Sequence, residues 1–253
     1  MEKAIITVAG KGGVGKTSIS AAVVRQLVKS FPSARILAID ADPAVGLATA
    51  LGVEVSQTVD DIRKSIAEAG KGDKTKRRAI ELLGEARFQL LDAMLEEKGF
   101  AFIAVGRPEA AGCYCSVNAY LREVISSLSE EFDYVVIDGE AGIEQVNRRV
   151  MEKVSHLILV SDPSKKGTRV IQTIKTVADE LVMYKHVGAV INRFNDEALK
   201  QYIDTGDIPV LAYIPDDAEL ALYDVQGRSV LELPDNSILV DGVLKTLEAI
   251  GII

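Results

Sequence analysis

The chain has 253 residues, and 48% of them are hydrophobic, which is enough apolar material for a sizeable buried core. Its 37 Asp and Glu residues outnumber 29 Lys and Arg residues, giving a formal net charge of −8. Because broad nucleic-acid binding rests on phosphate neutralisation by basic residues, this charge argues against it. No run approaches the roughly 20 apolar residues of a membrane span, and Met1-Glu2-Lys3 leads straight into a strand-like segment instead of a signal peptide. We therefore expect a cytoplasmic protein with no nucleic-acid or membrane partner.

Short apolar runs alternate with amphipathic helical stretches along most of the chain. Continuous apolar runs are typical of strands buried on both faces, and helical patterns such as Ser18 to Val28 and Thr168 to Val182 supply the connections between them. The predicted fold is α/β, a doubly wound and mostly parallel sheet. The runs that predict its strands are Ile5 to Val8, Ile36 to Ile39, Phe102 to Val105, Val135 to Ile137, Leu157 to Val160, Val187 to Ile191 and Val210 to Tyr213.

The chain contains no Pro/Gly/Ser-rich linker and no internal repeat, which favours a single domain over residues 1–253. The stretch from Glu54 to Glu97 is polar and helical in pattern, so we expect a helical insertion there, beside the sheet. A basic cluster at Lys165-Lys166-Gly167-Thr168-Arg169 either begins a helix or contacts a partner. His156 and His186 stand near strand starts, where we expect them to make structural hydrogen bonds.

A glycine-rich loop follows the first predicted strand and precedes a helical pattern that starts near Ser18. It fits the spacing G-x-x-x-x-G-K-[ST] of a P-loop, whose glycines let successive N–H groups converge on phosphate oxygens. Lys16 is expected to bridge the β- and γ-phosphates of ATP, and the Thr17 hydroxyl to hold magnesium. The residues of this predicted site are Gly10, Lys11, Gly12, Gly13, Val14, Gly15, Lys16, Thr17 and Ser18.

Polar residues close three other predicted strands, where the ligand sites of open α/β sheets lie. Asp40-Ala41-Asp42-Pro43 follows the second strand, and Asp138 follows the strand at Val135 to Ile137. Asn192-Arg193 follows the strand that ends at Ile191. An aspartate or asparagine at a strand end is also a common turn former or helix cap. From these residues alone, a ligand-binding role and a purely structural role therefore both stay open. Ile214-Pro215-Asp216 is expected to contribute backbone to a base pocket, with Pro215 at its centre.

The chain has two cysteines, Cys113 and Cys115, which follow the predicted strand at Phe102 to Val105. Two thiolates one residue apart can bind one soft or borderline metal, but they leave its coordination incomplete. Two copies of the segment that meet across a two-fold axis would supply four sulfurs. We therefore expect a homodimer with zinc, nickel or a similar ion at its interface. An iron–sulfur cluster and unliganded structural cysteines are the alternatives.

The run Lys-Gly-Gly-Val-Gly-Lys-Thr resembles the deviant Walker A loop of the Min/Par/nitrogenase-iron-protein class. In that class the early lysine, Lys11 here, reaches across a dimer interface to the partner's phosphates, where it acts like an arginine finger. The resemblance implies that Asp42 orients the attacking water and that Asp40 supports the magnesium shell. It also implies that Asp138 holds magnesium through water and that Asn192 reads the adenine edge. The catalytic residues expected on this basis are Lys11, Lys16 and Asp42, and Arg193 joins the base pocket.

Over nearly its whole length the chain resembles the CooC-type nickel-insertion ATPases that mature carbon monoxide dehydrogenase, with relatives that serve acetyl-CoA synthase. The specific part of this resemblance is the Cys113-Tyr114-Cys115 pair and Ala141-Gly142-Ile143-Glu144, because the Walker-type elements are shared across the superfamily. It implies a homodimer that hydrolyses ATP and loads nickel into one of these two enzymes as its client. The competing hypothesis is an ATP-gated scaffold, or an iron–sulfur or redox partner ATPase, with a structural interface metal.

Overall fold

The computed structural model describes residues 3–69, 85, 88–106, 115–139 and 154–253. Within them, eight strands form one sheet, and α-helices and two short 3-10 helices connect the strands. The strands are β1 (Ala4–Gly10), β2 (Ile36–Asp40), β3 (Leu95–Glu97), β4 (Phe100–Ala104), β5 (Tyr134–Asp138), β6 (His156–Ser161), β7 (His186–Asn192) and β8 (Val210–Ile214). The helices are α1 (Lys16–Ser30), α2 (Gly46–Leu51), α3 (Val59–Ala69), α5 (Cys115–Ser129), α7 (Lys165–Leu181), η1 (Glu197–Tyr202), α8 (Ala218–Gln226), η2 (Val230–Glu232) and α9 (Ile238–Ala249).

The strand order is β3-β4-β2-β5-β1-β6-β7-β8, and every neighbouring pair is parallel except β3 and β4. The register places Asp40 opposite Asp138 on β2 and β5, and Gly10 opposite Val160 on β1 and β6. The carboxyl ends of these four central strands therefore meet at one edge of the sheet. That edge is where an open α/β sheet binds its ligands.

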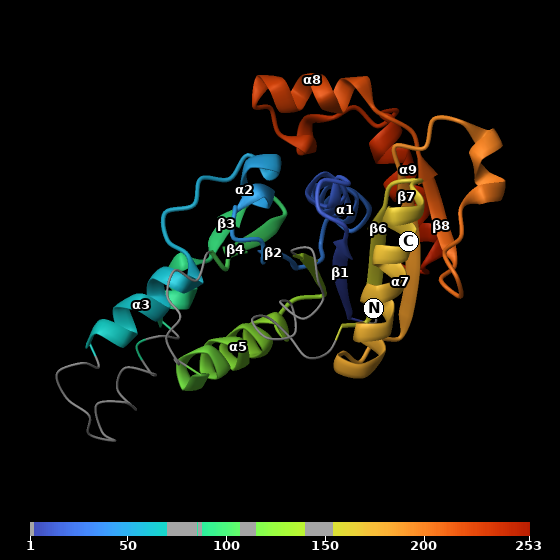
Figure 1. The fold of residues 1–253 in the computed structure, drawn as a ribbon. Helices are drawn as coiled ribbons and strands as arrows, with labels where there is room; N and C mark the ends of the chain where they lie inside the picture. Colours follow the sequence, from blue (N-terminus) through green and yellow to red (C-terminus); the bar gives the residue numbers. More distant parts are fainter. Residues whose placement is uncertain (1–2, 70–84, 86–87, 107–114, 140–153) are drawn as a thin grey trace.

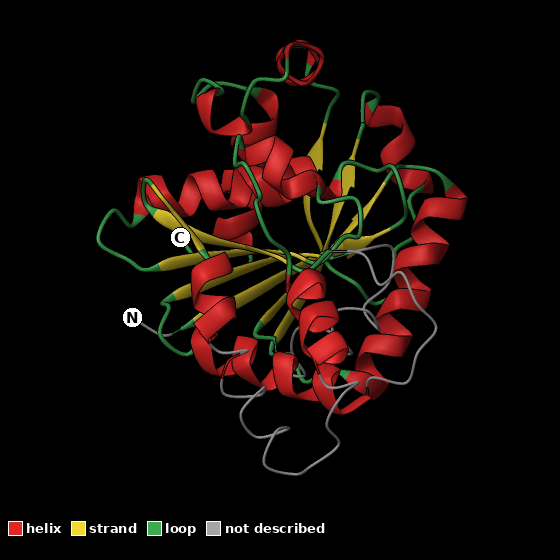
Figure 2. Cartoon of the chain, turned by 90° about the vertical axis from the view of Figure 1, so that its left-hand side faces the viewer, coloured by secondary structure: helices red, strands yellow, loops and turns green. Residues whose placement is uncertain are grey.

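Helices cover both faces of the sheet, and each face has its own apolar core (Figures 1 and 2). The core on one face joins α1, α2 and α9 to β1 and β2, with Leu27 and Val243 fully buried. The core on the other face joins α3, α5 and α7, with Ile62, Ile125 and Ile171 fully buried. β2, β5 and β6 are buried along their whole length. Because helices cover both faces of these strands, their side chains are apolar on both faces and their sequences do not alternate.

The predicted fold class is confirmed: the sheet is doubly wound, and seven of its strands correspond to the seven predicted apolar runs. The stretch predicted as a helical insertion, residues 54–97, contains α3 but also ends in β3, an antiparallel edge strand of three residues. Helical patterning alone was therefore wrong for its last residues. Residues 70–84 and 86–87 lie outside the described part, and the single-domain assignment stays a prediction. Among the described residues, no helix is both long and apolar enough to cross a membrane.

Candidate functional site

The P-loop connects β1 to α1 at the carboxyl edge of the sheet, and its backbone depends on two glycines without space for a side chain. At Gly10, with φ of 151°, a Cβ atom would lie 2.1 Å from the Val160 carbonyl oxygen. At Gly15, with φ of 91°, it would lie 2.6 Å from Nδ2 of Asn192. Gly12 and Gly13 have open space around them. The loop is thus fixed at its two ends and open in its middle, as a phosphate cradle requires.

The amino end of α1 is free to receive an anion. Gly15 precedes the helix, and no side chain caps it, so the first N–H groups of α1 have no intrahelical acceptor. The buried Lys16 side chain reaches back over the loop, where Nζ donates to the Lys11 carbonyl oxygen at 3.3 Å. An ammonium group and a helix amino terminus therefore face the same space. This combination is the usual basis of phosphate binding.

The Lys11 side chain forms an ion pair within its own chain. Its Nζ lies 2.6 Å from Oδ2 of Asp162, which follows β6. The other carboxylate oxygen, Oδ1, accepts from the backbone N–H and the hydroxyl of Ser164. Burial raises the pKa of Asp162, but the Lys11 and Ser164 hydrogen bonds outweigh it and hold the pKa below its ordinary value. Sequence patterns did not single out Asp162; its position directly after a predicted strand was the one available signal, and its place beside the P-loop strand is seen only in the structure.

Asp40 is buried at the end of β2, and both of its carboxylate oxygens accept from backbone N–H groups. Oδ1 accepts from Asp42 at 3.1 Å, and Oδ2 accepts from Leu47 at 2.8 Å and Ala48 at 3.3 Å. Burial, followed by the negative charge of Asp138, raises the pKa of Asp40 to about 7. Asp40 thus anchors the loop before α2 and the first turn of that helix. Its predicted contribution to the magnesium shell stays a prediction.

Asp138 is also buried, and one of its carboxylate oxygens has no hydrogen-bond partner among the described residues. Oδ1 accepts from the Ser20 hydroxyl at 2.8 Å, whereas Oδ2 has no hydrogen-bond partner among the described residues. Burial raises the pKa of Asp138 to about 6, against the lowering effect of the Ser20 and Thr17 hydroxyls and the Lys16 ammonium. A buried carboxylate oxygen without a partner is costly unless a cation or donor completes it. Ser20 was missed from the sequence, although it lies one turn after Thr17 on the same helix face.

The segment between β2 and α2 carries the first predicted switch residue, Asp42. This half-exposed side chain accepts from the Ala44 N–H at 2.8 Å through Oδ1, which forms a local turn. Val45 then adopts a left-handed conformation with φ of 52°, which is strained for a β-branched residue. The segment passes close to the P-loop helix, because a Cβ atom at Gly46 would lie 3.5 Å from Cγ2 of Thr17. Gly46, at the start of α2, is therefore near the magnesium ligand predicted from the sequence, and the predicted role of Asp42 stays a prediction.

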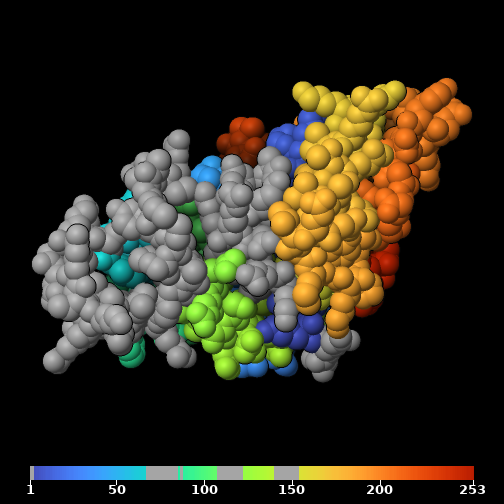
Figure 3. Space-filling model, turned by 60° about the horizontal axis from the view of Figure 1, so that its bottom comes forward, coloured from blue at the N-terminus to red at the C-terminus, as the bar shows by residue number. Residues whose placement is uncertain are grey.

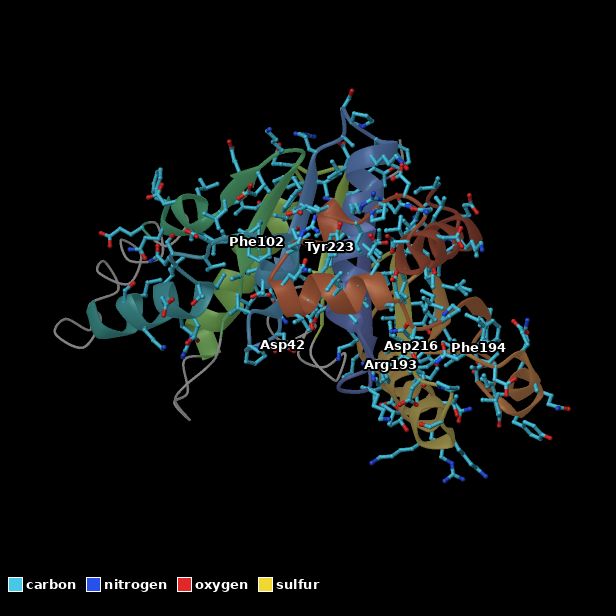
Figure 4. The ribbon with its side chains drawn as sticks, turned by 90° about the horizontal axis from the view of Figure 1, so that it is seen from above. Asp42, Phe102, Arg193, Phe194, Asp216 and Tyr223 are labelled. Carbon is cyan, nitrogen blue, oxygen red and sulfur yellow. The ribbon has the colours of Figure 1, made fainter. Side chains whose placement is uncertain are left out.

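The loops after β7 and β8 lie together beside the P-loop (Figure 4). Asn192 donates from Nδ2 to the Val14 carbonyl oxygen at 2.8 Å, so in this structure it supports the P-loop. Asn195 and Asp216 exchange two hydrogen bonds, of 2.6 and 2.9 Å, which fix the two loops to each other. Arg193, exposed and left-handed with φ of 58°, lies beside Asp216. The predicted role of Asn192, Arg193 and Pro215 in a base pocket stays a prediction.

Several predicted residues lie outside the described part of the chain. Cys113 and the Ala141-Gly142-Ile143-Glu144 segment are among them, and Cys115 is described only as the first backbone position of α5. Within the described residues, no group of three or more His, Cys, Asp or Glu side chains has the arrangement of a metal site. His156 and His186 stack with ring centroids 4.8 Å apart, and Nδ1 of His156 contacts the Ser155 hydroxyl at 2.7 Å. The structural hydrogen bond expected of His156 is thus observed, whereas that of His186 stays a prediction.

Residues 5–230 match the CbiA family, described as the CobQ/CobB/MinD/ParA nucleotide binding domain. The chain belongs to this family. It is a P-loop ATPase of the MinD/ParA type, with the lysine-rich phosphate loop, the two buried aspartates and the sheet described above.

Individual relatives of this ATPase differ in their described roles. The chain is 37% identical over 237 residues to an uncharacterized ATP-binding protein of Methanocaldococcus jannaschii, MJ0685, with 92% of each chain covered. It is 29% identical over 242 residues to the carbon monoxide dehydrogenase accessory protein CooC of Rhodospirillum rubrum, with 87% of this chain and 89% of CooC covered. Among solved structures, the Mg-ADP complex of MinD from Pyrococcus horikoshii superposes with a TM-score of 0.68 at 23% identity, covering 99% and 96% of the two chains. That structural likeness supports the fold.

Proposed function

We propose that this ATPase is a homodimeric nickel-insertion factor, which uses ATP binding and hydrolysis to load nickel into carbon monoxide dehydrogenase or acetyl-CoA synthase. The observation that carries the proposal is the similarity to CooC over most of the chain, together with a Cys-x-Cys pair in this sequence. Nickel is the cargo of the proposed reaction, bound and released by the protein. The alternative is an ATP-gated scaffold, or an iron–sulfur or redox partner ATPase, in which the metal is structural.

The nucleotide half of the mechanism rests on the geometry at the edge of the sheet. The P-loop N–H groups and the Lys16 ammonium bind the phosphates of ATP in the ground state. Thr17 and Asp138 fit magnesium, because the hydroxyl is a hard oxygen ligand and the free Oδ2 of Asp138 is buried beside it. Magnesium neutralises charge on the phosphates when bound. Asp42 is proposed to orient the attacking water, and the approach of Gly46, in the same segment, to Thr17 supports this role.

The dimer supplies the remaining positive charge. Lys11 is paired to Asp162 within its own chain, so without nucleotide it contributes little to the phosphate site. When two subunits close on ATP, Lys11 is proposed to leave Asp162 and reach the partner's phosphates. There it stabilises negative charge that develops during phosphoryl transfer. Hydrolysis would thus require the closed dimer.

The proposed link between ATP and metal binding rests on where the chain leaves the sheet before Cys113 and Cys115. β4 ends at Ala104, and the next N–H, of Val105, donates to the Asp40 carbonyl oxygen at 2.8 Å. The chain that leads to the cysteines therefore leaves the sheet directly beside the carboxyl end of β2 at Asp40, and Cys115 begins α5. A nucleotide-dependent movement of the Asp40–Asp42 segment could reach the cysteines through this one backbone contact. This proximity supports a link between ATP and metal binding.

The proposal is tested by measuring bound nickel and molecular mass together. In the presence of magnesium and a non-hydrolysable ATP analogue, we expect a dimer that holds one nickel ion. Cys113→Ser and Cys115→Ser should each abolish the metal, while the monomer stays folded because a core of this size does not depend on a metal clip. His186→Gln is the matched control, since it removes an exposed potential nickel ligand elsewhere. Nickel binding that survives both cysteine variants would contradict the proposal.

A further inference from the structure

The first half of α7 carries a group of cations that the nucleotide site does not use. Lys165, Lys166 and Arg169 are exposed, and together with Val170 and Thr173 they line a surface hollow of about 380 Å³. We call these five residues the α7 patch. These three cations lie within five residues of a chain whose net charge is −8. α7 forms a continuous ridge on the face shown in Figure 3.

The cations of the α7 patch have no compensating charge within the part of the chain that the structure describes. Among the described residues, no carboxylate lies within ion-pair distance of Lys165, Lys166 or Arg169. The acidic residues of α7, Asp179 and Glu180, lie at its other end, and Asp179 is already paired with Lys175. The patch is thus positively charged in the isolated chain.

The charge distribution along α7 is also opposite to the one that stabilises a helix. A helix amino terminus carries partial positive charge and favours anions, whereas its carboxyl terminus favours cations. α7 has lysines in its first turn, no acid there, and no basic residue in its last turn. Helix stability therefore gives no reason for these cations, and locally unfavourable choices of this kind are typical of interaction surfaces.

We propose that the α7 patch is a docking surface for an acidic segment of a protein client. An acidic peptide fits because three cations cover only the first turns of one helix. A nucleic acid or an anionic membrane would need a broader basic surface than this acidic chain offers. Val170 adds an apolar contact within the hollow. Docking would place the client beside the nucleotide edge, because α7 begins directly after the carboxyl end of β6.

A series of hydrogen bonds connects the start of α7 to Lys11 of the phosphate loop. Asp162 holds Lys11 and also accepts from Ser164, and the Ser164 hydroxyl in turn accepts from the Gly167 N–H to cap α7. If Lys11 leaves for the partner's phosphates, the Asp162 carboxylate stays unpaired next to the patch and lowers its net positive charge. An acidic client should then bind less tightly to the ATP-bound dimer. This link, unlike the surface itself, rests on the proposed function.

The test uses a fluorescein-labelled hexaglutamate peptide, with hexaglutamine as the uncharged probe, and fluorescence anisotropy without nucleotide. Wild type should bind hexaglutamate, and K165E/K166E should bind it at least about tenfold more weakly. The matched control is K98E/K245E, which changes the net charge equally on the β3–β4 turn and on α9 and should stay within about twofold of wild type. K165E/K166E should melt at the same or a slightly higher temperature, because glutamates suit a helix amino terminus.

Equal losses in K165E/K166E and K98E/K245E would overturn the proposal, since only total charge would then matter. Tighter binding of double-stranded DNA or of phosphatidylserine vesicles than of hexaglutamate would also overturn it.

The link to Lys11 is tested by repeating the peptide titration with magnesium and ATPγS, where we expect a several-fold weaker affinity. Equal affinity in a protein that dimerises with ATPγS would overturn the link. ATP hydrolysis by K165E/K166E should equal that of wild type. Failure of wild type to hydrolyse ATP would instead contradict the proposed function.

Discussion

The ammonium of Lys11 lies 2.6 Å from a carboxylate oxygen of Asp162, which follows the strand next to the P-loop strand. Both side chains are about one quarter exposed, at 27% and 24%. The pair therefore keeps the lysine of the phosphate loop inside its own subunit while leaving it accessible. In the proposed dimer, Lys11 must exchange this carboxylate for the partner's phosphates, so the Lys11–Asp162 contact sets part of the energy needed for closure.

The strength of this ion pair can be measured with a double-mutant cycle on the nucleotide-free monomer. We expect Lys11→Met and Asp162→Asn, singly and together, to give a coupling free energy of about 0.5–1 kcal/mol in urea unfolding. The value is small because the pair is partly solvated. It should decrease when salt is added. A coupling of zero at low salt would show that the two side chains do not interact in solution.

Lys11 and Lys16 should affect different steps of the reaction. Lys16→Ala should lose tight ATP binding, because this buried ammonium lies over the phosphate loop of its own subunit, where it is proposed to contact the phosphates. Lys11→Ala should change ATP affinity by less than about threefold but lower kcat by at least about 100-fold, since it acts on the transition state of the partner. Nucleotide affinity is measured by calorimetry and hydrolysis by phosphate release. The same loss of affinity in both variants would contradict this division.

Asp42→Asn should keep ATP bound and slow its hydrolysis, because the phosphate loop is intact and the carboxylate proposed to orient water is gone. The local turn survives, since an asparagine oxygen can still accept from the Ala44 N–H. A long-lived dimer with ATP and magnesium is the expected result in size-exclusion chromatography with light scattering. Continued turnover with the monomer–dimer mixture of wild type would exclude Asp42 as the hydrolytic residue.

Much of the fold could be predicted because the strands are buried on both faces. Val135-Val136-Ile137 shows this directly: a continuous apolar run is fully buried in β5. β3 could not be found, because its three residues include two exposed glutamates and form no apolar run. The P-loop was predictable as a motif. Asp162 and the contact of Asn192 with Val14 were not, since both depend on which strands become neighbours in the sheet.

Asp138 makes the stability of the metal-free protein depend on pH. Burial raises its pKa to about 6, above the ordinary value of an aspartate. Between about pH 4 and 6 the folded state keeps this proton while the unfolded chain loses it, so the free energy of unfolding falls as pH rises. Asp138→Asn should remove this contribution to the fall in the free energy of unfolding. The magnesium-free variant should therefore be about 1–3 kcal/mol more stable than wild type at pH 8. Urea unfolding at pH 5 and pH 8 measures the difference.

A second readout shows whether the same carboxylate binds magnesium. Magnesium and ATP together should raise the melting temperature of wild type but should raise that of Asp138→Asn much less. Ser20→Ala is the matched control, because it removes the hydroxyl on Oδ1 and leaves Oδ2 available. An Asp138→Asn protein that is less stable than wild type at pH 8 without magnesium would contradict the predicted burial cost.

The most direct test of the account is a nickel titration of the wild-type protein with and without magnesium and a non-hydrolysable ATP analogue, paired with an ATP-analogue titration at zero and saturating nickel. If nucleotide and metal are coupled through the dimer, the nucleotide must change nickel affinity by the same factor as nickel changes nucleotide affinity. We predict a change of about fivefold or more in both, with one nickel ion per dimer. An unchanged nickel affinity in a protein that dimerises with the nucleotide would contradict ATP-dependent nickel loading and favour a structural metal.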